Sequence, residues 1–296
     1  MRKQIAFGLV GMMGVALVAT YAGARVAAQG GNDVIVPAVS PLAFQPPIVF
    51  QAAGPNIASI QGTVDAFRAA LGGVNNGNVA GPLVGGRREI NWDGGGSVAT
   101  SPAPTPFDGF LVTRGGRFST IGTGFVQAPV GGLATTFGNP SYANIFQAFS
   151  AVRLFSPVGS NLTDARFFVP GGGELPATTV GFGAIFSDVD TQDPNGAKKG
   201  NAPTTMSFFG VNGNALYTTV VPASLGNASL TFLGVVFQDA RIAHVRIGTG
   251  SAAPGPDDTQ ARDIVMMDDF IYGEPQVVNG PAALRMLDEA AKERAR

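Results

Sequence analysis

The sequence predicts an all-β protein, an antiparallel β-sandwich of the jelly-roll kind, with one helix near the N-terminus and a short helix at the C-terminus. The 42 glycines and 21 prolines among 296 residues indicate many turns. Charged residues make up 13% of the chain, which is about half the usual share, and 21 phenylalanines can supply the bulk of a core. Short apolar segments separated by turn signals are typical of sandwiches and barrels.

The N-terminus has the pattern of a secretory signal peptide. Arg2 and Lys3 precede an uncharged, mostly apolar run over residues 5–19, and small residues at 22–28 form cleavage sites. An uncleaved membrane anchor is the alternative, but the run is shorter than the ~20 residues that span a bilayer. We therefore expect a signal peptide over residues 1–28 and a secreted protein, extracellular or periplasmic, with no transmembrane span after cleavage.

The composition excludes several classes of function. A net charge of -1 gives no basic surface for nucleic acid. The chain has no cysteine and one histidine, which excludes zinc sites built on cysteines or on several histidines. An exported chain without disulfides must depend on its core, or on a bound ion, for stability.

The first half of the chain combines a linker, one helix and several strands. Residues 29–50 are expected to be an extended linker, and residues 51–275 a single β-sandwich domain. Residues 56–71 are expected to be helical because their apolar residues recur at helical spacing. Residues 87–93 alternate like a strand with one buried face, whereas residues 142–155 fit a helix or a strand equally well. Further strands are expected at 110–113, 118–119 and 124–127.

The strands of the second half are more clearly marked. The turn Asn212-Gly213-Asn214 predicts a hairpin because these residues tolerate a positive φ. Residues 230–237 are apolar on both faces, which predicts a central strand. The expected strands are 180–186, 206–209, 215–221, 230–237, 242–247 and 263–275. A helical tail is expected over residues 276–296, opened by Pro281.

Two blocks of sequence carry a family resemblance. They comprise residues 67–72 with 87–94, and residues 181–190 with 232–237, 242–247 and 267–273. Together they resemble a group of uncharacterised secreted bacterial proteins, and the second block is similar to the β-sandwich ectodomains of PEP-CTERM exported proteins. The resemblance implies an exported all-β domain at the cell envelope or in the matrix. The chain lacks the Pro-Glu-Pro tripeptide, terminal apolar span and basic cluster of that family's sorting tail, so we expect free secretion.

An acidic loop follows the expected strand 180–186. Asp188, Asp190 and Asp193 fall within residues 188–196, and short acidic loops of this kind supply oxygen ligands to calcium. The match to an EF-hand is poor, because the glycine comes late and Lys199 stands where a bidentate glutamate belongs. The loop is either a solvated turn or a structural calcium site.

Two adjacent carboxylates, Asp268 and Asp269, interrupt the apolar strand that closes the domain. Strand alternation predicts that they point to opposite faces, so that one of them must be hydrogen-bonded or metal-bound if both faces are covered. They can serve an edge strand, where an aspartate meets a backbone N–H or an arginine. Alternatively, they join Asp188 and Asp190 in one ion site.

Glu89, Asn91 and Asp93 line a polar strand face beside Trp92, which makes the four residues candidates for ligand binding. Glu89 and Asp93 are poor candidates for a glycosidase pair. Residues four apart on a strand lie about 13 Å from each other, whereas catalytic carboxylate pairs need about 5–9.5 Å. His244 is the sole histidine and no Gly-x-Ser-x-Gly sequence is present, so we assign no catalytic residue.

We expect a secreted, non-enzymatic β-sandwich protein of the bacterial envelope or extracellular matrix, similar in kind to lectins and carbohydrate-binding modules. Its expected partner is an extracellular polysaccharide or a cell-surface component, and calcium is its expected structural ion. Two alternatives stay open. One is an extracellular carbohydrate-active enzyme on a jelly-roll scaffold, and the other is an inert structural or assembly subunit.

Overall fold

The structure, a computed structural model, describes residues 45–190, 202–259 and 261–295. By its contacts the chain divides into two units, residues 1–43 and 44–296, and all described residues belong to the second. The predicted signal peptide and most of the predicted linker lie outside the described residues. Within the described ranges, no helix is both long enough and apolar enough to cross a membrane.

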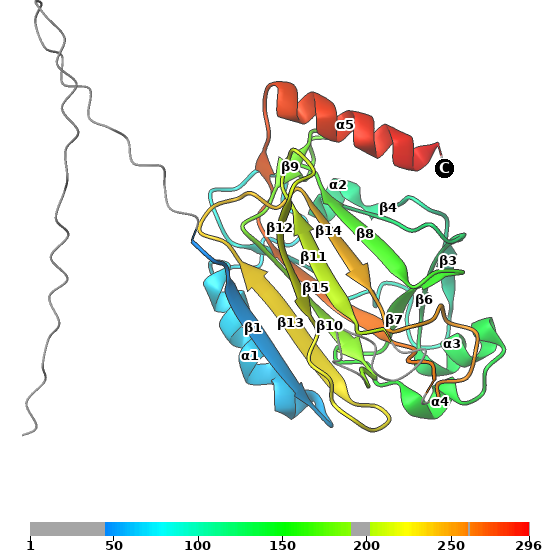
Figure 1. Ribbon diagram of the computed structural model, residues 1–296. Helices are drawn as coiled ribbons and strands as arrows, with labels where there is room; N and C mark the ends of the chain where they lie inside the picture. Colours follow the sequence, from blue (N-terminus) through cyan, green and yellow to red (C-terminus); the bar gives the residue numbers. More distant parts are fainter. Residues whose placement is uncertain (1–44, 191–201, 260, 296) are drawn as a thin grey trace, which may run out of the picture. The chain divides into compact units, whose positions relative to one another are not determined.

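Two antiparallel β-sheets make up most of the second unit, as the composition predicts (Figure 1). The larger sheet has the order β1 (Ile48–Gly54), β13 (Leu230–Val236), β10 (Gly181–Ser187), β15 (Met266–Gly273), β7 (Leu154–Val158), β6 (Gly124–Ala128), β3 (Ser101–Ala103), and β2 (Arg87–Ile90) also pairs with β15. The smaller sheet has the order β12 (Ala215–Val220), β11 (Thr205–Phe209), β14 (His244–Gly248), β8 (Leu162–Phe167), β5 (Gly116–Ser119), β4 (Phe107–Phe110). A short ribbon pairs β16 (Gln276–Val277) with β9 (Ala177–Thr178).

The described helices lie outside the sheets. They are α1 (Ile57–Ala70), α2 (Leu111–Arg114), α3 (Val130–Phe137), α4 (Tyr142–Ile145) and α5 (Pro281–Arg294). The helix predicted over residues 56–71 is confirmed as α1, and Asn56 caps it by accepting the backbone N–H of Ser59 at 3.2 Å. The predicted C-terminal helix is α5.

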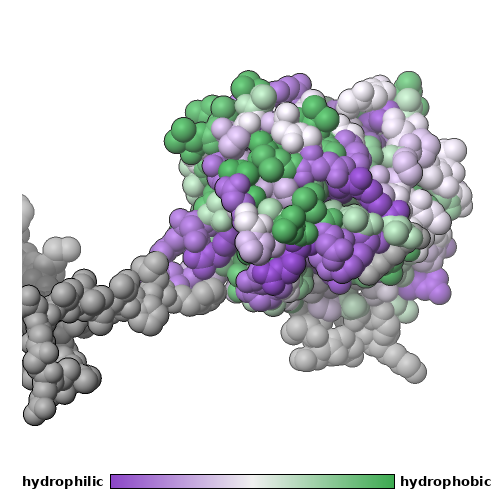
Figure 2. All heavy atoms as spheres, turned by 90° about the horizontal axis from the view of Figure 1, so that it is seen from above, coloured by the Kyte–Doolittle hydropathy of each residue, from purple (hydrophilic) through white to green (hydrophobic). Residues whose placement is uncertain are grey.

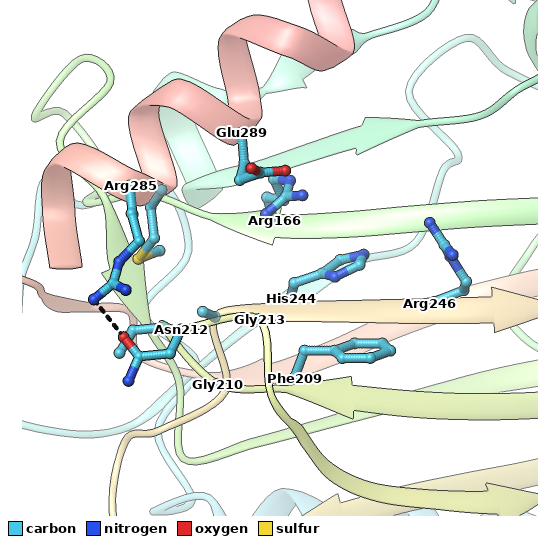
Figure 3. Close-up of a pocket in the computed structure, with 12 residues that line it drawn as sticks. Arg166, Phe209, Gly210, Asn212, Gly213, His244, Arg246, Arg285 and Glu289 are labelled. Carbon is cyan, nitrogen blue, oxygen red and sulfur yellow. Dashed lines mark hydrogen bonds between the residues drawn. The ribbon is translucent and has the colours of Figure 1, made fainter.

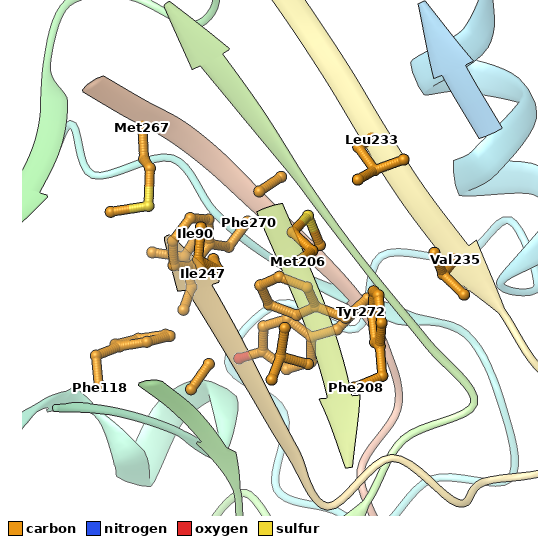
Figure 4. Packing of buried hydrophobic residues seen from close by; sticks show 14 of the residues in the cluster. Ile90, Phe118, Met206, Phe208, Leu233, Val235, Ile247, Met267, Phe270 and Tyr272 are labelled. Carbon is orange, nitrogen blue, oxygen red and sulfur yellow. The ribbon is translucent and has the colours of Figure 1, made fainter. Parts of the chain in front are cut away.

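The facing sides of the two sheets share one hydrophobic core, whose packing Figure 4 shows. Phenylalanines bridge it: Phe118 of the smaller sheet contacts Phe270 of the larger one with ring centroids 5.4 Å apart. On β14, Val245 is buried in this core while His244 and Arg246 point outward, as the alternation predicts. The aromatic residues therefore hold the two sheets together mainly through buried apolar area.

Helix α1 covers the outer face of the larger sheet at the β1–β13–β10 side. Its Phe67 is fully buried against two glycines, Gly183 and Gly234, which lie opposite each other in the β10–β13 pairing. A Cβ atom at Gly183 would lie 2.9 Å from the Phe67 ring, and one at Gly234 would lie 2.6 Å from it. The paired glycines form the notch that lets the helix approach the sheet.

Several predicted elements differ from the structure, including the linker expected over residues 29–50, whose last three residues belong to β1. The strand predicted at 110–113 is wrong, because Leu111–Arg114 forms the single turn α2, which ends at Gly115 in the left-handed region with φ 73°. The strand predicted over 87–93 ends at Ile90, since Trp92 has a positive φ of 64° that a strand cannot contain. The ambiguous segment 142–155 holds both predicted structures, with α4 at its start and β7 beginning at Leu154.

A buried ion pair anchors the long loop before β2. Arg88 on β2 donates from Nε and Nη2 to the two carboxylate oxygens of Glu274, at 2.6 and 2.7 Å, and both side chains are almost fully buried. Asn76 donates to the same carboxylate at 2.8 Å, and Arg88 Nη1 donates to the carbonyl of Gly77 at 2.7 Å. One bidentate pair therefore fixes the loop to the end of β15.

Removing Arg88 should be strongly destabilising, because Glu274 would remain buried without its partner. We expect Arg88→Met to lower the free energy of unfolding by roughly 3–5 kcal/mol, measured by urea denaturation at pH 7. The control Arg241→Met removes an exposed pair with Asp239 and should cost no more than about 1 kcal/mol. The double variant Arg88→Met, Glu274→Met should recover part of the loss. Equal effects of the two single variants would contradict the prediction.

Candidate metal centre

Three aspartates meet where the chain leaves β10. One carboxylate oxygen from each of Asp188, Asp190 and Asp258 lies within 4.8 Å of the others. Asp188 and Asp190 directly follow β10, whereas Asp258 comes from the segment between β14 and β15. The antiparallel pairing of β10 with β15 places Ser187 opposite Met266. This register brings together two acidic segments that are far apart in the sequence.

The carboxylates at this place are deeply buried. Asp188 is 0% exposed, and Asp263, which lies just before β15, is 1% exposed. From the described parts of the chain, none of their four carboxylate oxygens receives a hydrogen bond of ordinary length and angle. Asp188 also has a left-handed backbone, with φ 69°. A buried carboxylate without donors is unfavourable, so the cluster is suited to a positively charged partner.

Burial and like charges together raise the pKa values of these acids. Burial first, and then three neighbouring aspartates, raise the pKa of Asp188 to about 9. Burial, followed by the charges of Asp190 and Asp258, raises the pKa of Asp263 to about 8. Burial also raises the pKa of Asp258. The nearby backbone of Ala228 offsets only part of the effect on Asp188, so without a cation these groups favour the protonated state at neutral pH.

The residues fit a hard divalent cation. Asp188, Asp190 and Asp258 would hold it through carboxylate oxygens, which calcium and magnesium prefer, and Asp263 lies near enough for the charges of Asp190 and Asp258 to raise its pKa. Calcium accepts six to eight oxygens in irregular geometry, including bidentate carboxylates, whereas magnesium requires a near-octahedral set of six. A buried group of carboxylates from two irregular segments therefore suits calcium better than magnesium.

The sequence predicts two of the four aspartates at this place. Asp188 and Asp190 belong to the predicted acidic loop, while the third predicted ligand, Asp193, lies outside the described residues. Sequence reasoning missed Asp258 and Asp263. Their signal is a pair of acids placed shortly before a strand of core residues, but only the register between β10 and β15 shows that they approach the loop.

Asp268 and Asp269 form a second acidic group, and their predicted placement on opposite faces of the strand is wrong. Ala184 lies opposite Phe270, and Phe186 lies opposite Met267, so the two aspartates of β15 share one partner position on β10. This is a β-bulge, which puts both carboxylates on one face. Met267 and Phe270 on either side both remain in the core between the sheets, so the aspartates point to the outer face.

The contacts of this pair differ from those of the metal cluster. Asp268 Oδ2 accepts the backbone N–H of Phe149 at 2.6 Å, and Asp269 Oδ1 accepts the hydroxyl of Ser150 at 2.7 Å. Arg68 Nη2 lies 3.8 Å from Asp269 Oδ2. Among the described residues, the carboxylates that lie within 4.8 Å of one another at the metal cluster come from Asp188, Asp190 and Asp258, so the geometry gives no support to one joint ion site with Asp268 and Asp269.

Burial and the mutual repulsion of the two carboxylates favour a protonated state of this pair. Asp268 is 0% exposed, and burial, followed by the charge of Asp269, raises its pKa well above the usual range. Burial is also the main reason that the pKa of Asp269 is raised to about 6, although Ser150 and Arg68 oppose the shift. At neutral pH the pair therefore keeps one proton, and a carboxyl group faces a carboxylate.

The residues predicted to bind a ligand do not form one strand face. The strand ends at Ile90, and the chain turns at Trp92, which separates Glu89 from Asp93. Trp92 is 0% exposed and stacks on Phe155 with ring centroids 3.7 Å apart. Its indole N–H donates to the backbone carbonyl of Asp268 at 3.0 Å. Trp92 is thus a core residue and offers no surface for a sugar to stack on, whereas Asn91 is exposed.

The two carboxylates of this group are already engaged by the protein. Asp93 Oδ1 accepts the backbone N–H groups of Val152 and Arg153 at 2.6 and 2.9 Å. Glu89 Oε2 lies 3.0 Å from Arg68 Nη2, and Arg87 forms a second ion pair with Glu89. Both acids therefore position the loop and α1 rather than face an open cleft.

Comparison with known proteins adds no family to this description. No protein-family model matches the chain, and neither the curated proteins nor the solved structures contain a match. The inference of function therefore rests on the geometry and electrostatics of the described residues.

Stability in the absence of metal should fall as the pH rises. Asp188 and Asp263 have raised pKa values in the folded state, so the folded protein binds more protons than the unfolded chain between pH 4 and pH 9. In chelator we expect the melting temperature to fall steadily from pH 5 to pH 9. Saturating calcium should flatten this fall, because the cation replaces the protons. Equal slopes with and without calcium, measured by calorimetry, would contradict the cluster.

Asp268→Asn should flatten the pH dependence of the melting temperature that remains in saturating calcium, because the amide replaces the protonated carboxyl group. In saturating calcium, the wild-type protein should lose stability as the pH rises above about 4, because the folded pair retains protons that the unfolded chain releases. The variant should melt near the wild type at pH 5.5 and above it at pH 8.5. Asp65→Asn is the control, since the exposed Asp65 also pairs with Arg68 but has a lowered pKa. An unchanged slope in Asp268→Asn would refute the retained proton.

Proposed function

We propose that the chain is a secreted, non-enzymatic β-sandwich protein of the bacterial envelope or extracellular matrix, jelly-roll-like in topology, which a structural calcium ion stabilises. The observation that carries the calcium role is the burial of Asp188 and Asp263 with no ordinary hydrogen bond to their carboxylate oxygens from the described residues. Two antiparallel sheets that share one core support the sandwich.

The position of the site explains why an ion would matter. Asp188 and Asp190 directly follow β10, and Asp258 comes before β15, so a bound cation would tie the end of one central strand to the segment that leads into the next. The chain has no cysteine with which to form a cross-link. Calcium would supply a comparable constraint, and it is a common stabiliser of extracellular modules.

The enzymatic alternative has less support. Asp93 and Glu89, the acids considered for glycosidic chemistry, are held by backbone amides and arginines. The buried pair Asp268–Asp269 is nearly inaccessible to a substrate, since both residues are at most 3% exposed. We therefore favour a binding or structural role over catalysis.

Calcium should raise the melting temperature, and the effect should depend on Asp188. Calcium at 100 times its dissociation constant would stabilise the fold by about 2.7 kcal/mol, which corresponds to roughly 5–10 °C for a domain of this size. Magnesium at the same concentration should give a smaller shift. Asp188→Asn should raise the melting temperature in chelator, because it removes a buried repulsion, and should abolish most of the calcium shift.

A matched control distinguishes the site from a general effect of calcium. Asp257→Asn alters an exposed acid next to Asp258 and should keep the full calcium shift. A wild-type protein with no calcium shift, or an Asp188→Asn variant with the full shift, would reject the proposed calcium role. An Asp188→Asn variant that is destabilised in chelator would also speak against it.

A further inference from the structure

A groove separates α5 from the outer face of the smaller sheet. It has a volume of about 380 Å³ and lies between β8, β14, the turn from β11 to β12, and α5 (Figure 3). Met286 and Ala290 anchor α5 by burial, and the helix forms one wall. Figure 2 views the molecule from the α5 side and shows hydrophilic residues interleaved with hydrophobic ones.

The groove is lined by positive side chains. Arg166, Arg246 and Arg285 line it together with one acid, Glu289, among its described residues. Arg285 on α5 donates to the uncharged Asn212 at 2.7 Å, as Figure 3 shows. The guanidinium groups come from three different elements, so they surround the space rather than form a stripe along one helix.

The acids that fix these arginines lie behind them. Arg246 donates from Nε and Nη2 to Asp164 at 2.8 and 2.9 Å, and His244 Nε2 lies 2.6 Å from the same carboxylate. Arg166 Nε donates to Glu293 at 2.9 Å. Asp164 and Glu293 line a neighbouring hollow instead of the groove.

The arrangement holds the cationic groups in place before any ligand arrives. Although burial opposes ionisation, hydrogen bonds from His244 and Arg246 lower the pKa of Asp164 to about 2. The carboxylate is therefore charged at all physiological pH values and keeps both partners oriented. The ion pair of Arg246 uses Nε and Nη2, which leaves Nη1 outside the pair. Such a preorganised guanidinium favours an oxyanion partner.

The floor of the groove is aromatic. The rings of Phe209 and His244 stack with centroids 5.0 Å apart and planes inclined by 19°, and Figure 3 shows them lying one over the other. A flat apolar surface next to cationic donors suits a ligand that has both an apolar ring face and an anionic group. A free inorganic anion would use the arginines alone and leave the aromatic floor unused.

We propose that this groove binds a carboxylate-bearing sugar residue of an acidic polysaccharide, with the sugar ring against Phe209 and His244 and its carboxylate at Arg285. The proposal names the ligand class for the surface-binding role and rests on that proposed function. Glu289 would accept hydrogen bonds from the sugar hydroxyls, and Asn212 would accept or donate them. A size of 380 Å³ lies at the lower end of ordinary ligand pockets, which suits one or two sugar residues.

The test is titration calorimetry with a galacturonate hexamer, using the full chain and the same calcium concentration in both solutions. A neutral glucose hexamer and sodium sulfate are the comparison ligands. We expect binding of the acidic oligomer, affinity that falls as salt rises, and at least tenfold weaker binding of the glucose hexamer. Arg285→Gln should weaken binding of the acidic oligomer about tenfold, and Phe209→Ala should also weaken this binding. Arg294→Gln should leave the affinity unchanged.

The control residue Arg294 lies on the same helix but pairs with Glu174 outside the groove. Equal binding of the neutral and acidic oligomers would overturn the proposal, as would an Arg285→Gln variant that binds like the wild type. Sulfate that binds as tightly as the oligomer would reduce the groove to a simple anion site and would also overturn it. A wild-type protein whose melting temperature does not rise with calcium, but which still binds the acidic oligomer, would contradict the calcium role alone. Failure of the calcium role and failure of the sugar proposal are therefore distinguishable.

Discussion

The burial of carboxylates along β15 is the constraint on which the rest of the structure depends. This central strand and its flanks carry four acids that are at most 3% exposed: Asp263, Asp268, Asp269 and Glu274. An isolated charge in such a place is strongly unfavourable. The protein compensates each one differently, with Arg88 at Glu274 and a retained proton at Asp268 and Asp269. Asp263 belongs to the cluster that suits a cation.

These compensations also organise the surrounding chain. The partners of the acids come from β2, from α1 and from loops: Arg88 of β2 also holds the loop before that strand through Gly77, and Phe149 and Ser150 bring the segment after α4. The polar contacts therefore determine how irregular segments cover the outer face of the larger sheet. Apolar area alone is less directional and would leave their placement less defined.

Local patterns were sufficient to predict much of the fold. The spacing of Ile60, Val64 and Phe67 predicts α1, and the alternation around Val245 predicts which side of β14 is buried. A bulge has no comparable signature, because the extra residue is defined by the partner strand. For the same reason, no sequence pattern indicates that Asp268 and Asp269 share a face, or that Asp258 approaches Asp188. Trp92 is a core residue and not a ligand-binding one, and the alternation over residues 87–93 already places it on the same side as the buried Ile90.

The bulge at Asp268 and Asp269 has a consequence for how this chain can change over evolutionary time. Side chains alternate along a strand, and the extra residue of the bulge is what lets Met267 and Phe270 both face the core although two residues separate them. Deleting either aspartate would restore ordinary alternation and leave both core residues in place. In related chains, this segment should therefore tolerate the loss of one aspartate, whereas a deletion elsewhere in β15 would turn the residues beyond it from the core to the outer face.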